Sequence, residues 1–240
     1  MISSPLRIGL AGLGTVGTGV INLLRHHHGC CVTAVSARNP AKDRGVDLSG
    51  VAWVDNPVDL AYRDDVDVVV EVMGGDGDPA LSLIQAALNA GKPVITANKA
   101  LLAHHGVALA SLAEKNNTPL RYEAAVAGGI PIIKMVREGF AANTISALAG
   151  ILNGTCNYIL TTMDQTGRGF DTVLPEAQAL GYAEADPTLD VDGGDTGHKL
   201  CLLTALAFGC VPDDTHLSVQ GIRKISIADI RVARAWGYRI

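Results

Sequence analysis

Short apolar segments alternate with longer amphipathic segments along the first half of the chain. The short segments are bounded by glycine, proline or polar residues, which is typical of buried strands. The longer segments carry apolar residues at helical spacing. We therefore predict strands at 6–11, 32–37, 67–73, 93–97 and 120–125, with helices after the first strand and at 79–90 and 101–115. This alternation predicts an α/β fold built on a doubly wound, mostly parallel sheet of the Rossmann type.

The pattern changes near residue 125, and a glycine-rich link follows at 126–131. We predict two domains, a first built on the parallel sheet at 1–128 and a second at 129–240. In the second domain the apolar pattern indicates helices at 132–140, 172–180 and 195–208, and a strand at 145–152.

A glycine pattern, G-x-G-x-x-G, stands between the first predicted strand and the helix that follows it. The pattern is weak alone, but in this setting it indicates a site for a dinucleotide pyrophosphate. The first glycine permits a tight turn, the second lets the pyrophosphate approach the backbone, and the third allows close helix–strand packing. An ordinary glycine-rich turn is the alternative. We predict cofactor contacts for Gly12, Leu13, Gly14, Thr15, Val16 and Gly17.

Further cofactor contacts are expected where the other strands end, because open α/β sheets bind ligands at the carboxyl ends of their strands. Gly74, Thr96 and Lys99 occupy such positions. Arg38 directly follows the second predicted strand, near the position where an NAD-selective site commonly has an acidic residue. A guanidinium group can pair with a 2′-phosphate, so Arg38 favours NADP over NAD. A solvent-facing arginine is the alternative.

Residues 181–199 form a short acidic segment that closes with a lysine. Like charges repel at close range, so the cluster is explained best by a cationic partner: a substrate ammonium, a metal, or the lysine itself. Asp195 and Lys199 are four residues apart and share one face of a helix that begins near Asp195. The charged residues of the segment are Glu184, Asp186, Asp190, Asp192, Asp195 and Lys199.

Composition narrows the class of protein. A formal net charge of −5 argues against a nucleic-acid partner, which would require a basic surface. The 5 cysteines lack any Cys-x-x-Cys spacing, so we expect neither a disulfide framework nor a zinc site. Free cysteines are typical of a reducing compartment, and we therefore expect a cytoplasmic location. The longest apolar run falls short of the roughly 20 residues that span a bilayer, so no membrane partner is expected.

Taken in order, the motifs of this chain resemble those of the homoserine dehydrogenase family. The resemblance rests on the glycine pattern at 12–17, Thr-Ala-Asn-Lys-Ala-Leu-Leu at 96–102, Tyr-Glu-Ala-Ala-Val-Ala-Gly-Gly-Ile-Pro at 122–131, Asn-Gly-Thr-Cys-Asn-Tyr-Ile-Leu at 153–160, and the acidic segment. It implies reversible reduction of L-aspartate 4-semialdehyde to L-homoserine with NAD(P)H, in the biosynthesis of threonine and methionine. It also implies that the second domain is an α+β substrate and dimerisation domain.

The resemblance assigns roles to individual residues. Lys199 matches the proton donor, Asp195 a carboxylate near the reacting hydroxyl, and Lys99 a second catalytic lysine that also binds substrate. Glu184 and Asp190 match substrate-binding carboxylates, whereas Asp186 and Asp192 are expected to be solvent-facing or structural. Helix capping by Glu184 or Asp195, a surface pairing for Lys199 and a strand-end role for Lys99 are the alternatives.

The resemblance also implies a site for a monovalent cation such as sodium near the domain boundary. Its ligands would be the carboxylate of Glu123 and the backbone carbonyls of Val126, Gly128 and Ile130, since hard cations favour oxygen ligands. An ordinary loop is the alternative.

Members of the family continue well past the equivalent of Ile240. We therefore expect the substrate domain to be incomplete in this chain, and a homodimer only where that domain is complete. A dinucleotide-binding fragment without turnover, or another amino-acid dehydrogenase of the same two-domain plan, is the alternative function.

Overall fold

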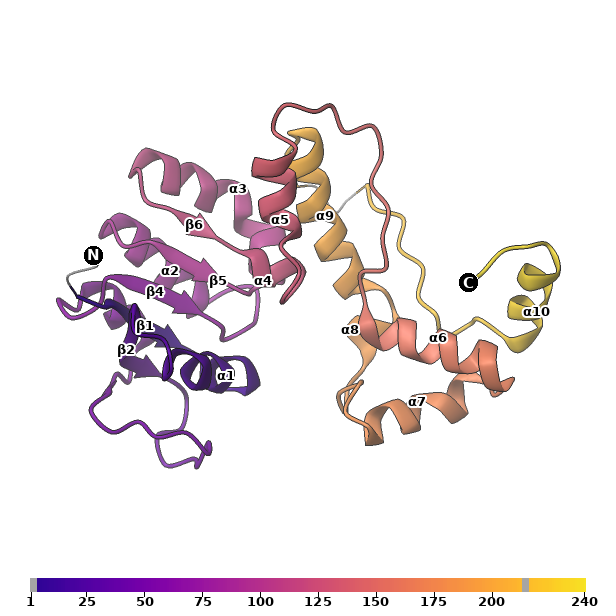
Figure 1. Ribbon diagram of the computed structural model, residues 1–240, viewed down its shortest axis with the longest axis horizontal. Helices are drawn as coiled ribbons and strands as arrows, with labels where there is room; N and C mark the ends of the chain where they lie inside the picture. The colour runs from indigo at the N-terminus through magenta and orange to yellow at the C-terminus, as the bar shows by residue number, and fades with distance from the viewer. Residues whose placement is uncertain (1–3, 213–215) are drawn as a thin grey trace. The chain divides into compact units, whose positions relative to one another are not determined.

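The computed structural model describes residues 4–212 and 216–240, and the chain forms two compact units. The first unit contains the described residues up to Asn143 together with Gly209–Pro212. The second contains Thr144–Phe208 and the described residues after 215. Each unit has its own buried core, and each is described by itself (Figure 1).

The first unit is built on a parallel sheet, as the alternating pattern predicts. Its strand order is β3-β2-β1-β4-β5-β6, so the chain adds strands on one side of β1 and then returns to add strands on the other. Right-handed crossovers then place the helix before this return on one face of the sheet and the helices after it on the other face. The strands are β1 (Leu6–Ala11), β2 (Cys30–Ser36), β3 (Ala52–Trp53), β4 (Val68–Glu71), β5 (Val94–Thr96) and β6 (Leu120–Arg121) (Figure 1).

The register of the sheet brings the ends of four strands to one edge. Ala11 pairs with Ser36 on one side and with Glu71 on the other, and Glu71 pairs with Thr96. The loops that leave β1, β2, β4 and β5 therefore start side by side. This is the edge where a doubly wound sheet binds its ligand.

Helices connect the strands of the first unit. Apolar residues of α1 pack on the sheet, with Ile21 in one buried cluster with Ile8, Leu10 and Val35. The helices of this unit are α1 (Thr15–Leu24), η1 (Pro57–Tyr62), α2 (Ala80–Asn89), α3 (Lys99–Lys115), α4 (Glu123–Val126), α5 (Ile132–Lys134) and the π-helical turn η2 (Met135–Gly139).

The second unit is helical in its described residues. Ile159, Met163, Val173 and Val191 belong to one buried cluster drawn from several of its helices. The helices are α6 (Gly154–Thr166), α7 (Phe170–Ala179), α8 (Thr188–Val191), α9 (Gly194–Phe208) and α10 (Ile227–Ala235).

Two strand predictions are wrong in part or in full. The strand expected at 120–125 ends at Arg121, because its neighbour β5 is short and the Ala-rich residues from Glu123 favour a helix. Residues 145–152 form no strand, since the described part of the second unit holds no strand for them to pair with. Ile151 in that segment is 80% exposed.

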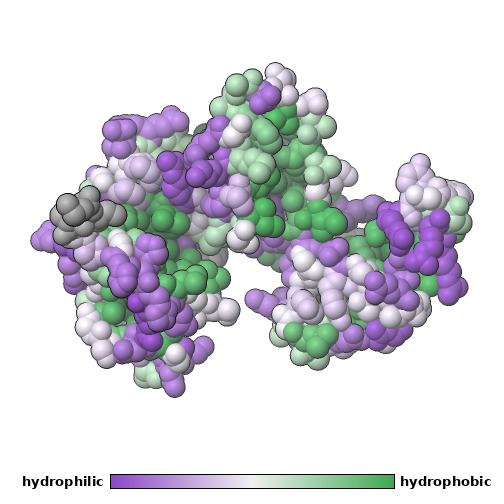
Figure 2. Space-filling view, viewed as in Figure 1, coloured by the Kyte–Doolittle hydropathy of each residue, from purple (hydrophilic) through white to green (hydrophobic). Residues whose placement is uncertain are grey.

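The surface of the first unit is mixed in character. In the space-filling view, hydrophilic and hydrophobic residues are interspersed over its visible face (Figure 2). Among the described residues, no helix is long and apolar enough to cross a membrane.

Candidate active site

The glycine turn of the first unit has the geometry that a dinucleotide requires. Gly12 has φ +102°, and a Cβ on it would lie 2.6 Å from the carbonyl oxygen of Val72. A Cβ on Gly17 would lie 1.9 Å from the carbonyl oxygen of Gly12, so α1 packs directly against the turn. A Cβ on Gly14 would meet no atom within 4 Å. The fold needs the first and third glycines, whereas the second leaves open space beside the backbone.

The N-terminus of α1 faces that open space. Gly14 is the N-cap residue, and no side chain caps the helix. The first N–H groups of a helix have no acceptor within the helix, and together with the helix dipole they favour a phosphate. The turn therefore fits a dinucleotide pyrophosphate.

A cavity of about 320 Å³ lies at this turn. Of the predicted cofactor residues, Gly12, Leu13, Gly14 and Arg38 line it, whereas Thr15, Val16, Gly17, Gly74, Thr96 and Lys99 do not. Six further residues line this cavity without having been predicted as cofactor contacts: Ala37, Asn39, Lys42, Arg44, Val72 and Met73.

The two arginines in the cavity differ in their surroundings. Arg44 donates to the backbone carbonyls of Leu13, Lys42 and Asn39 at 3.2, 2.7 and 2.7 Å, and it lies over the Trp53 ring. It therefore fixes the loop after β2. Arg38 is exposed, and in the described part of the chain its side chain forms no hydrogen bond or ion pair, so its guanidinium group can meet an anion.

A buried carboxylate links the loops that leave β4 and β5. Glu71 is fully buried; it accepts hydrogen bonds from the Met73 N–H at 2.7 Å and from the Thr96 hydroxyl at 2.6 Å. The hint in the sequence is a single charged residue inside an otherwise apolar strand. Lys99 begins α3 and is half-buried, and Asn98 caps that helix by accepting from the Leu101 N–H.

The second unit contains a buried carboxylate paired with a lysine, as the spacing of the acidic segment predicts. Asp195 lies in the first turn of α9 and is 4% exposed. The Lys199 ammonium lies 2.7 Å from its Oδ2 and also donates to the Leu152 carbonyl at 2.9 Å. The Lys199 side chain is 18% exposed, which excludes an ordinary surface lysine.

Asn153 joins the two predicted site carboxylates of this unit. Its Nδ2 donates to Asp190 at 2.8 Å and to Asp195 at 2.9 Å, while its Oδ1 caps α6 by accepting from the Cys156 N–H. The one hydroxyl hydrogen of Thr155 is shared between the Tyr182 carbonyl at 2.6 Å and Asp190 at 3.1 Å. The sequence motif contained Asn153 without revealing this role.

The other acidic residues of 181–199 lie in different surroundings. Glu184 is exposed, and in the described residues its carboxylate has no hydrogen-bond or ion-pair partner. Asp186 accepts from the Thr188 N–H at the start of α8, and Asp192 pairs with Arg223 at 2.6 Å. The last two therefore have structural contacts, as expected.

Cys156 lies next to Asp190, one of the two carboxylates that Asn153 joins. Its thiol donates to the Asp190 carbonyl at 3.2 Å. Burial, and then the charges of Asp190 and Asp195, raise the pKa of the Cys156 thiol to about 11. The thiol is therefore protonated near neutral pH and is a poor nucleophile.

Two of the four predicted cation ligands, Glu123 and Ile130, have hydrogen-bond partners within the protein. The Glu123 carboxylate accepts from the Ile133 and Lys134 N–H groups at 2.7 and 3.0 Å, and the Ile130 carbonyl accepts from the Ile132 N–H. Glu123 thus fixes the start of α5. The cation site remains a prediction.

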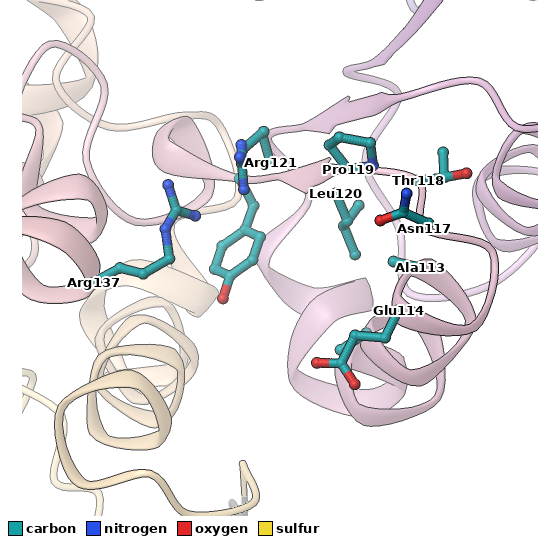
Figure 3. Close-up of a pocket in the computed structure, with 10 residues that line it drawn as sticks. Ala113, Glu114, Asn117, Thr118, Pro119, Leu120, Arg121 and Arg137 are labelled. Carbon is teal, nitrogen blue, oxygen red and sulfur yellow. The ribbon is translucent and has the colours of Figure 1, made fainter. Parts of the chain in front are cut away.

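A second cavity of the first unit, about 370 Å³, lies beside β6 and the end of α3 (Figure 3). Arg121 and Arg137 line it together with Glu114 and Tyr122. Burial raises the pKa of Tyr122. The cavity contains none of the predicted site residues.

The sheet order, the glycine turn and the cavity at the turn define a dinucleotide-binding protein of the Rossmann type. The family model described as the homoserine dehydrogenase NAD-binding domain matches residues 12–123, and the homoserine dehydrogenase model matches 131–240. The chain belongs to the homoserine dehydrogenase family, a family of NAD(P)-dependent oxidoreductases.

Individual relatives agree with this assignment. The homoserine dehydrogenase of Neisseria gonorrhoeae is 47% identical over 98% of this chain, and the chain spans 56% of its length. A crystal structure of a homoserine dehydrogenase from Thiobacillus denitrificans is 44% identical, with a TM-score of 0.93, over 98% of this chain and 56% of that one.

Two archaeal structures are more distant. A putative homoserine dehydrogenase from Archaeoglobus fulgidus is 34% identical, with a TM-score of 0.85, over 98% of this chain and 78% of that one. A hyperthermophilic archaeal homoserine dehydrogenase in complex with NADPH is 26% identical, with a TM-score of 0.81, over 93% of this chain and 76% of that one. The chain thus spans a little over half the length of the curated relatives it matches.

Proposed function

We propose that this chain carries the reaction of homoserine dehydrogenase, the reversible reduction of L-aspartate 4-semialdehyde to L-homoserine. The observation that carries the proposal is the half-buried Lys199 ammonium, 2.7 Å from the buried Asp195 carboxylate, in a family of NAD(P)-dependent oxidoreductases. Reduction of an aldehyde by hydride leaves a negative charge on oxygen. A buried ammonium group is suited to stabilise that charge and to give it a proton.

The residues of the second unit would have different roles in the reaction. A bound nicotinamide cofactor supplies the hydride. Lys199 donates the proton to the carbonyl oxygen as it becomes a hydroxyl, and Asp195 with the Leu152 carbonyl holds the Lys199 ammonium in place. Asp190, held by Asn153 and Thr155, is proposed to bind the substrate ammonium, with Glu184 as a second carboxylate. Lys99 of the first unit is proposed to contact both cofactor and substrate.

For the cofactor we propose NADP in preference to NAD. Arg38 and Lys42 are exposed cationic residues in the cavity at the glycine turn, and a 2′-phosphate carries the complementary charge. The archaeal relative solved with NADPH supports the same choice. A monovalent cation at Glu123, a cytoplasmic location and a homodimer stay predictions for this chain.

The test is NADPH oxidation by the purified chain with aspartate semialdehyde, followed at the absorbance of NADPH. We expect Lys199→Met to abolish turnover while NADPH binding is kept. Lys224→Met changes an exposed lysine of the same unit and is the matched control, with activity unchanged. Full turnover in Lys199→Met contradicts the proton-donor role.

The same assay decides between this proposal and its rivals. NADPH binding without turnover of aspartate semialdehyde supports a dinucleotide-binding fragment. Turnover of only a different amino-acid-derived carbonyl compound supports another dehydrogenase of the same two-domain plan.

A further inference from the structure

Glu71 is a fully buried carboxylate that the proposed reaction does not use. It is the last residue of β4, and the register places it between Ala11 of β1 and Thr96 of β5. Burial of a carboxylate is costly unless its oxygens are hydrogen-bonded. A strand in the core of a parallel sheet gains nothing from such a residue, since an apolar side chain would fill the same space.

Both oxygens of Glu71 are engaged, and by two different loops. Oε1 accepts from the Met73 N–H at 2.7 Å, in the loop that leaves β4. Oε2 accepts from the Thr96 hydroxyl at 2.6 Å, where the chain leaves β5. One side chain therefore ties together two loops at the ligand-binding edge of the sheet.

The hydrogen bonds continue from Thr96 to the helix that carries Lys99. The Asn98 N–H donates to the Thr96 hydroxyl oxygen at 3.0 Å, and Asn98 Oδ1 accepts from the Leu101 N–H at 3.2 Å. Asn98 is the N-cap of α3, and Lys99 is the first residue of that helix. Each link in this chain of bonds thus sets the position of the next, from Glu71 to the start of α3.

The direction of these bonds requires a carboxylate at position 71. The Met73 N–H can only donate, and the Thr96 hydroxyl has one hydrogen, which it donates to Oε2, so each of these two hydrogens uses an acceptor oxygen of Glu71. An amide offers one acceptor oxygen and an NH₂ group. In Glu71→Gln either the Met73 N–H or the Thr96 hydroxyl hydrogen therefore loses its acceptor.

The loop that leaves β4 after Glu71 contains two consecutive glycines with positive φ. Gly74 and Gly75 follow Met73 with φ of +81° and +85°, which is the left-handed region. A Cβ on either glycine would meet no protein atom within 4 Å, so their backbone borders open space. The Met73 N–H held by Glu71 is the last point at which β4 fixes this loop.

We infer that Glu71 is a positioning residue of the cofactor site, which holds the loop at Met73–Gly75 and the start of α3 at Lys99 in register with each other. The inference rests on the proposed function, because it takes the ligand at this edge to be a nicotinamide dinucleotide. Glu71 acts through the Met73 N–H and through Thr96 and Asn98.

The test measures the affinity of the 240-residue chain for NADPH from the change in NADPH fluorescence on binding. We expect Glu71→Gln and Thr96→Val to weaken binding about tenfold or more, the scale of one lost hydrogen bond to a charged group. Thr96→Ser keeps the hydroxyl and should bind within about twofold of the parent, on the same scale.

Asp67→Asn is the matched control, an acid-to-amide change at the opposite end of the same strand. Asp67 stands just before β4 and pairs with Arg7 at 2.6 Å, away from the loops that leave the strand ends. We expect Asp67→Asn to lower the stability of the first unit and to leave NADPH affinity unchanged. Comparison of the two amide variants separates loss of stability from loss of positioning.

The outcomes are distinct. NADPH affinity equal to that of the parent in Glu71→Gln overturns the inference, and so does an equal loss of affinity in Asp67→Asn. If Glu71→Gln does not fold, the Thr96→Val and Thr96→Ser pair decides, with equal affinities counting against the inference. A parent chain that binds neither NADPH nor NADH overturns the proposed function as well, whereas a binding parent with an unaffected Glu71→Gln overturns the positioning role alone.

Discussion

Lys199 reaches back one helical turn along α9 to Asp195, with 2.7 Å between the ammonium nitrogen and Oδ2. The pair differs from a surface i,i+4 pair because Asp195 is buried and also accepts from the Asn153 amide at 2.9 Å. A lysine side chain has four rotatable bonds and loses much conformational entropy when it is fixed. Asp195 and the Leu152 carbonyl together hold it in one place.

This relationship predicts the effect of removing the carboxylate charge alone. Asp195→Asn keeps the volume of the side chain but weakens its hold on the Lys199 ammonium. We expect turnover to fall roughly 100-fold or more, the range of a misplaced general acid, with NADPH affinity unchanged. Steady-state kinetics and NADPH titration measure the two quantities. Asp192→Asn, on an exposed carboxylate paired with Arg223, should keep its activity. Equal losses in both variants would count against a specific role for Asp195.

The hydrogen bonds of Asn153 predict its contribution to the stability of the second unit and to substrate binding. Its Nδ2 donates to both Asp190 and Asp195, and its Oδ1 caps α6. Asn153→Ala should therefore lower the free energy of unfolding by about 2 kcal/mol, from the lost cap and the bonds to two charged groups. It should also raise KM for the amino-acid substrate. Asn157→Ala, an exposed position on the same helix, is the control and should change neither quantity. A stability unchanged in Asn153→Ala would contradict the bridging role.

Arg38 predicts the cofactor preference. Arg38→Ala should weaken NADPH binding about tenfold or more while leaving NADH binding nearly unchanged, because only NADPH carries the 2′-phosphate. Arg44→Ala is the informative comparison. Arg44 holds the loop after β2 through backbone carbonyls, so its loss should weaken both cofactors together. Equal weakening of NADPH and NADH in Arg38→Ala would refute the 2′-phosphate contact.

Local sequence patterns predicted the main strands and helices of the first unit, because the features that indicate each element lie within a few residues of one another. The glycine turn and the strands ending at Ala11, Ser36 and Thr96 all follow from adjacent sequence. The strand predicted at 145–152 failed for the opposite reason, since a strand forms only with a partner. The helix at Gly154–Thr166 was not predicted, although Asn153 before it is a typical N-cap residue.

The connections within the site could not be predicted from spacing. Asn153 meets Asp190 and Asp195 across 37 and 42 residues, and Glu71 meets Thr96 across 25. The acidic segment predicted a cationic partner for its carboxylates, and Lys199 is the cationic partner of Asp195. Which neutral side chains hold the charges in place depends on packing of elements far apart in sequence, and no short-range pattern records it.

Asp67 gives a prediction about pH. The guanidinium of Arg7 donates hydrogen bonds to Asp67 and lowers its pKa from 3.8 to about 2. A carboxylate with a lowered pKa in the folded state adds stability above its unfolded pKa, and this is lost as the pH falls toward the folded pKa. The first unit should therefore lose this contribution between about pH 4 and pH 2.

The measurement uses the two tryptophans of the chain. In a Trp236→Phe background, Trp53 of β3 alone reports denaturant unfolding of the first unit. The difference in stability between the parent and Asp67→Asn should be constant above about pH 5 and shrink as the pH falls to 2. A difference that stays constant across this range would show that the ion pair with Arg7 does not stabilise the unit.

Cys156 gives the last prediction, on chemical reactivity at the site. Burial and the neighbouring Asp190 and Asp195 raise the pKa of the Cys156 thiol to about 11 from its ordinary value of 9.0, so its thiolate fraction near pH 8 is lowered roughly 100-fold. Alkylation by iodoacetamide, followed peptide by peptide in a mass spectrometer, should modify the exposed Cys210 well before Cys156. Asp190→Asn removes one of the two charges and should speed alkylation of Cys156 without changing that of Cys210. Burial is the larger cause of the shift, so the gain should be smaller than the full difference between the two thiols. Labelling of Cys156 as fast as Cys210 in the parent chain would show that the carboxylates and the burial around this thiol are not as the structure places them.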